Sequence, residues 1–110
     1  MISPRFIEII SQLKTLHERK NAGYSGEDNP DPWANFRHSM DIGVPASKGA
    51  IIRMCDKIER IKSLTRLPSN EQVGEDITTT LADVAAYAII TICLLEEEGG
   101  PKYVVEGVSK

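Results

Sequence analysis

The sequence predicts an all-α protein, a small bundle of three to four helices that dimerisation completes. Apolar residues recur every three to four positions through three long segments, which is the period of an amphipathic helix. The alternation typical of a strand is absent, apart from a short candidate at residues 103–105. Because so few helices leave apolar faces uncovered, we expect a homodimer or a higher homo-oligomer.

The first predicted helix covers residues 4–20, with Ser3 as N-cap and Pro4 at the first helical position. An irregular loop follows at 21–32, where two Asp/Asn-Pro steps favour extended backbone. Loops of this length in small domains are often functional. The loop is therefore a candidate binding segment as well as a plain connection between helices.

The next elements are a short helix at 33–40 and a strongly periodic helix that Ser47 caps and that ends near residue 65. The last helix runs to about residue 98, with Ser69 and Gln72 as a capping-box pair. We expect one helical domain over residues 1–98, followed by a tail at 99–110.

Bulk properties exclude several classes of function. The chain has 110 residues and a net charge of −3, so electrostatic capture of nucleic acid is not expected. We expect a buried helix rather than a membrane span, since the longest apolar run is 85–95 and a span takes about 20 residues. Cys55 and Cys93 are predicted to be reduced, buried and packed as small apolar residues, as in a cytoplasmic protein.

Asp83 is the most unusual residue of the last helix, because an almost wholly apolar segment follows it. A carboxylate buried there costs several kcal/mol unless it is paired or bound to a metal. One explanation is structural, an ion pair with Arg53 or Arg60 of the preceding helix. The other is a functional site.

The functional explanation is a metal site between two helices. Asp56 and Glu59 are three apart on one helix, and Asp76 and Asp83 are seven apart on the next. Four such carboxylates, if they converge, suit a hard cation such as Mg²⁺ or Mn²⁺ that also coordinates phosphate.

Cations and aromatic residues near these acids point to a nucleotide. Arg53, Lys57 and Arg60 form a basic stripe, which is either a solvated face or a set of phosphate ligands. Six side chains are predicted to pack in the bundle or to line the ligand site. Trp33 and Phe36 are expected to pack, and the candidate ligands are Lys20, Tyr24 and Arg37 around the loop and Tyr87 on the last helix.

Three blocks together resemble a known family: KNAGYSGEDNPDPWANFRHS, IIRMCDKIERIKSL and GEDITTTLADVAAYAII. Over residues 18–95, their order and spacing are similar to the phage family called nucleotide-modification-associated domain one. That family is itself similar to the all-α MazG-like nucleoside triphosphate pyrophosphohydrolases. The resemblance implies a MazG-like bundle with Mg²⁺ held by acids, and with Glu59 and Asp83 as catalytic residues.

The chain departs from that pattern at three positions. The resemblance places the two acidic motifs on Asp56-x-x-Glu59 and on Thr80-x-x-Asp83, where Asp56 and Thr80 each replace a glutamate. Thr79 stands where the nearer family usually has an acid. Fewer acids weaken metal binding. Three hypotheses follow: a Mg²⁺-dependent pyrophosphohydrolase, a non-catalytic protein that sequesters a cyclic or ADP-ribose-type nucleotide against antiviral defence, and a structural or interaction protein.

Overall fold

The computed structural model describes residues 1–25 and 31–107, with side chains for 1–20 and 31–107. Its elements are α1 (Pro4–Ser25), the 3₁₀ helices η1 (Ala34–Phe36) and η2 (His38–Ile42), α2 (Ala46–Thr65) and α3 (Glu71–Glu97). The part of the chain that the structure describes contains no strand. The predicted all-α bundle is confirmed, and dimerisation stays a prediction.

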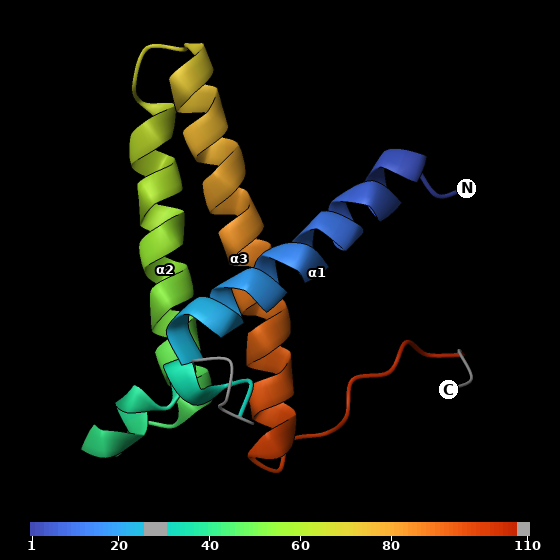
Figure 1. Cartoon of the computed structure of the whole chain (residues 1–110), viewed down its shortest axis with the longest axis vertical. Helices are drawn as coiled ribbons and strands as arrows, with labels where there is room; N and C mark the ends of the chain where they lie inside the picture. Colours follow the sequence, from blue (N-terminus) through green and yellow to red (C-terminus); the bar gives the residue numbers. More distant parts are fainter. Residues whose placement is uncertain (26–30, 108–110) are drawn as a thin grey trace.

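Helices α2 and α3 form a long antiparallel pair, and α1 crosses one side of it (Figure 1). The α2–α3 contact is the most extensive between any two elements, and α1 contacts mainly α3 and η1. Ala46 and Ala50 of α2 pack against Ile90 and Leu94 of α3 and make the core. The small alanine side chains allow the two helices to approach closely.

Helix ends differ from the predicted caps. Asn70 caps α3, accepting a hydrogen bond of 2.9 Å from the Val73 amide, so the prediction of a Ser69–Gln72 capping box was wrong by one residue. Ser47 lies inside α2 and does not cap it. Its amide donates to the Glu98 carboxylate at 3.0 Å, so an acid from the end of α3 serves the start of α2.

Arg37 ties the segment between α1 and α2 to the end of α3. It binds Asp31 at 2.6 Å and Glu97 at 2.7 Å. Hydrogen bonds from Arg37 lower the pKa of both carboxyl groups. At Asp31 a hydrogen bond from the Trp33 amide lowers the pKa further. The predicted helix over 33–40 is two 3₁₀ turns instead, and Gly43, with φ of 79°, ends the second.

Three further predictions need correction. α1 continues to Ser25, beyond the predicted end at 20, because one helical glycine costs only about 1 kcal/mol. The tail at 101–107 forms no strand. Cys55 is exposed rather than buried, on a side of α2 that no other part of the described chain covers, and Cys93 is half-buried. Both cysteines are free, as predicted.

Helix α3 was expected to be a buried helix, and it is buried on one side only. By length and composition it is long and apolar enough to cross a membrane. Only 28% of its 18-residue apolar stretch is buried within the chain. Core helices of soluble proteins reach the same length and apolar composition.

Candidate functional site

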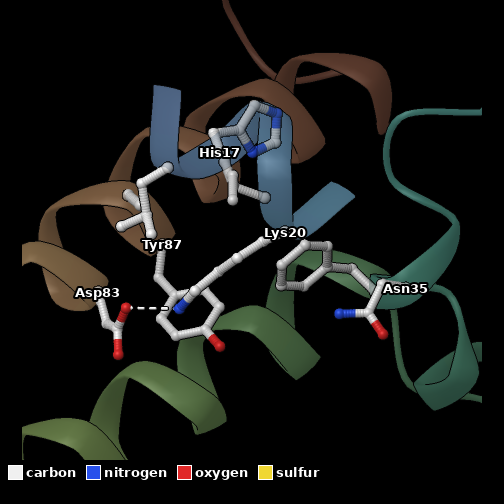
Figure 2. Close-up of a pocket in the computed structure, with 9 residues that line it drawn as sticks. His17, Lys20, Asn35, Asp83 and Tyr87 are labelled. Carbon is white, nitrogen blue, oxygen red and sulfur yellow. Dashed lines mark hydrogen bonds and ion pairs between the residues drawn. The ribbon is translucent and has the colours of Figure 1, made fainter. Parts of the chain in front are cut away.

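A small, partly enclosed cavity of about 40 Å³ lies where α1 crosses α3, beside η1. We call it the Asp83 cavity. Its lining residues are Leu16, His17 and Lys20 of α1, Asn35 and Phe36 of η1, and Asp83, Ala86, Tyr87 and Ile90 of α3. Figure 2 shows Lys20 reaching from α1 to Asp83, while Asn35 lies on the far side of the cavity.

Two lysines hold the Asp83 carboxylate. Asp83 is 7% exposed, with Lys20 Nζ 2.7 Å from one carboxylate oxygen and Lys57 Nζ 3.2 Å from the other. Burial raises the pKa of Asp83, but the hydrogen bonds from Lys20 and then from Lys57 outweigh it. The pKa therefore lies below its ordinary value. Asp83 is ionised at neutral pH.

The predicted need of Asp83 for a partner is confirmed, but the predicted partners, Arg53 and Arg60, were wrong. Lys20 reaches Asp83 because α1 crosses α3 at that level, and a contact across 63 residues of sequence leaves no local pattern. Lys57 comes from the predicted helix, at the turn facing Asp83.

Aromatic rings form the walls around these charges. Phe36 and Tyr87 meet edge to face with their centroids 5.7 Å apart, and the Arg53 guanidinium lies 5.4 Å from the centre of the Phe36 ring. His17 stacks against Trp33 at 5.7 Å. Trp33 and Phe36 pack against the core, as predicted.

The cavity is suited to an anion that carries a flat apolar group. Lys20 and Lys57 bring two positive charges to one carboxylate, so a net positive charge remains at the α3 side. The Lys20 side chain is 41% exposed and can reorient toward a ligand. Phe36 and Tyr87 offer faces on which a planar ring can stack.

The predicted carboxylate cluster does not form within one chain. Asp76 accepts a hydrogen bond from Gln72 at 3.0 Å, Glu59 pairs with Lys62 at 3.0 Å, and Asp56 is exposed. Among the described residues, no group of three or more His, Cys, Asp or Glu side chains lies close enough to hold a metal ion. The donor set present therefore does not fit a Mg²⁺ site in the single chain.

Other predicted ligands lie elsewhere. Arg37 binds Asp31 and Glu97 and does not line the Asp83 cavity. Arg60 is exposed on α2, outside the cavity lining. The Tyr24 side chain lies outside the described residues.

The sequence interpretation missed two cavity residues, His17 and Asn35. His17 had a detectable signal, since it is three residues before Lys20 and so shares its helical face. Asn35 had none, because its place depends on how η1 packs against α1 and α2.

Comparison with protein families gives one match. The family model described as nucleotide modification associated domain 1 matches residues 46–95, which include Lys57, Asp83 and Tyr87. Residues 18–45 of the predicted resemblance, with Lys20, lie outside the match. Comparisons with curated proteins and with solved structures found no match. The α2–α3 pair is thus similar to nucleotide modification associated domain 1 over residues 46–95.

Proposed function

We propose that the chain binds a nucleotide in the Asp83 cavity. The observation that carries the proposal is the Lys20–Asp83–Lys57 cluster beside two aromatic rings, since it combines a phosphate ligand with a stacking surface. The cavity of about 40 Å³ must widen to admit a nucleotide, and the Lys20 side chain, which is 41% exposed, can turn outward to do so. The name of the matched family agrees with a nucleotide role.

In the proposed complex, Lys20 turns from Asp83 toward the phosphate, and Lys57 alone then neutralises the carboxylate. Asp83 acts as a positioning residue that keeps both lysines at the cavity. One of the two rings, Tyr87 or Phe36, stacks on the base, while the other, at 83° to it, meets the base at an angle. The Asn35 amide offers a donor and an acceptor to the edge of the base. Binding of this kind needs no metal ion.

Hydrolysis of a nucleoside triphosphate is the second candidate. The observation that favours it is that Asp56 and Glu59 remain exposed on α2, the helix that also supplies Lys57. Because the acids of one chain do not converge, we derive no step through Mg²⁺. Retention of an intact ligand instead would suit a protein that sequesters a cyclic or ADP-ribose-type nucleotide in the cytoplasm.

The test is to incubate purified protein with a mixture of nucleoside mono-, di- and triphosphates, cyclic nucleotides and ADP-ribose, with Mg²⁺ in one arm and EDTA in the other. Mass spectrometry of the retained and released fractions identifies ligand and products. The proposal predicts a retained, intact nucleotide in both arms. Turnover confined to the Mg²⁺ arm would establish the second candidate. Absence of binding at millimolar nucleotide would contradict both and leave a structural role for the ion pairs.

A further inference from the structure

The amino-terminal half of α1 carries an apolar stripe that no described part of the chain covers. Phe6, Ile9 and Ile10 are 58%, 46% and 51% exposed. Further along the same face of the helix, Leu13 and Leu16 are half-buried against the rest of the chain. The stripe is therefore continuous, but α1 projects beyond the α2–α3 pair and only its second half finds a partner (Figure 1).

An apolar groove lies beside this stripe, between α1 and α3. Its volume is about 260 Å³, and its lining is apolar except for Lys14 and His17: Ile10, Leu13, Lys14, His17, Trp33, Ala86, Ile89 and Ile90. Three more exposed apolar side chains of α3, Leu81, Ile92 and Leu95, share one side of that helix. Stripe, groove and α3 side together form what we call the α1–α3 surface.

The chain exposes more surface than a compact monomer of its mass, and a dimer interface would cover part of that surface. The chain exposes 8239 Å², whereas a compact monomer of 12.2 kDa exposes about 6,100 Å². Its radius of gyration is 16.0 Å, against about 13 Å for a compact domain of this length. The extended, exposed tail at 101–107 (Figure 1) contributes part of this surplus of roughly 2,100 Å² per chain, and obligate homodimers bury about 1,000–2,500 Å² on each subunit.

We infer that a second copy of this chain covers the α1–α3 surface, with the first half of α1 of each copy packed in the groove of the other. A two-fold arrangement satisfies both requirements at once, because each copy supplies a projecting apolar helix and an apolar groove. A lipid surface fits less well. Helix α2 lies along α3 and carries Arg53, Asp56, Lys57, Glu59, Arg60 and Lys62, which a bilayer around α3 would have to desolvate.

The inferred partner also bears on the Asp83 cavity. Groove and cavity share His17, Ala86 and Ile90, so a helix seated in the groove forms a wall directly beside the cavity. Dimerisation thus encloses the nucleotide site that a single chain leaves open. The association itself rests on surface area and geometry and stands whether or not a nucleotide binds.

The first experiment uses the unaltered protein. Sedimentation velocity at micromolar concentration is expected to give a species of twice the chain mass. Hydrogen exchange is expected to show amides of residues 4–14 protected at high protein concentration and exposed on dilution. A monomer at 100 μM, or residues 4–14 that exchange rapidly at every concentration, would overturn the inference.

A matched pair of variants locates the interface. Phe6→Asp with Ile10→Asp is expected to abolish the dimer peak, while Leu67→Asp, at an equally exposed site in the α2–α3 connection, leaves it unchanged. Circular dichroism checks that the helices persist. A dimer that survives the double substitution places the interface elsewhere and contradicts the inference, as does cosedimentation of a monomer with phosphatidylcholine–phosphatidylglycerol vesicles.

Discussion

Asp83 shows how one buried charge organises its surroundings. At 7% exposure the carboxylate has lost most of its water, and the two lysines replace it as hydrogen-bond donors. Lys20 comes from α1 and Lys57 from α2, so a single side chain of α3 fixes the positions of both other long helices at the cavity.

Replacing this carboxylate by an amide is expected to destabilise the fold. Asp83→Asn leaves Lys20 and Lys57 without a counter-charge and should lower the free energy of unfolding by about 1–3 kcal/mol. Asp76→Asn, at a site where the carboxylate accepts a hydrogen bond from Gln72 on its own helix, should change it by less than about 0.5 kcal/mol. Urea denaturation followed by circular dichroism measures both. Equal effects would show that the lysine pairs contribute nothing specific.

The depressed pKa of Asp83 predicts a loss of stability in acid. Because the folded-state pKa lies below the ordinary 3.8, the unfolded chain takes up a proton more readily than the native one. The stabilisation is therefore complete above the ordinary pKa and disappears as pH falls through the folded-state value. Asp31 and Glu97 act in the same direction through Arg37.

Unfolding free energies measured from pH 6 to pH 3 test this. The unaltered protein should lose stability as the pH falls below about 5, and Asp83→Asn should show a shallower decrease. Identical slopes would contradict the assignment of the effect to Asp83.

At the scale of elements, periodicity predicted the long helices and their apolar faces, but not how they end. The end of α1 was misplaced because the irregular loop was taken to begin at residue 21, whereas the helix continues to Ser25. Helices η1 and η2 lie beside Arg37, which binds Glu97 of α3 in a long-range contact. The same limit explains the site. The depth of Asp83 follows from the helical period, whereas the reach of Lys20 depends on where α1 crosses α3.

The cap of α3 gives a direct test at this scale. Asn70→Ala removes the bond to the Val73 amide and should cost about 1 kcal/mol, since the first turn of a helix has unsatisfied N–H groups. Ser69→Ala, one residue earlier, should be nearly neutral. Thermal unfolding of the two variants compares them. A larger effect at Ser69 would return the cap to the residue that sequence reasoning chose.

At the scale of the whole molecule, the chain exposes more surface than its mass requires and has its cavity beside that surplus surface. The sequence could not predict this surplus surface. Apolar periodicity shows that a helix has an apolar face, but not whether the chain itself covers that face. For that reason helix α3 was predicted to be buried, although only 28% of its apolar stretch is buried in the structure.

The central claim is that the Asp83 cavity binds a nucleotide through Lys20, and the single tryptophan offers a direct reading of it. Trp33 stacks on His17, which lines the cavity, so its fluorescence should respond to a ligand there. A titration excited at 295 nm, in EDTA, with the nucleotide retained in the binding experiment should give a saturable change. Lys20→Met should weaken binding at least about tenfold, the effect of losing one charge-assisted hydrogen bond, while Lys62→Met should leave it unaltered. Equal affinity in Lys20→Met and the unaltered protein would contradict the account.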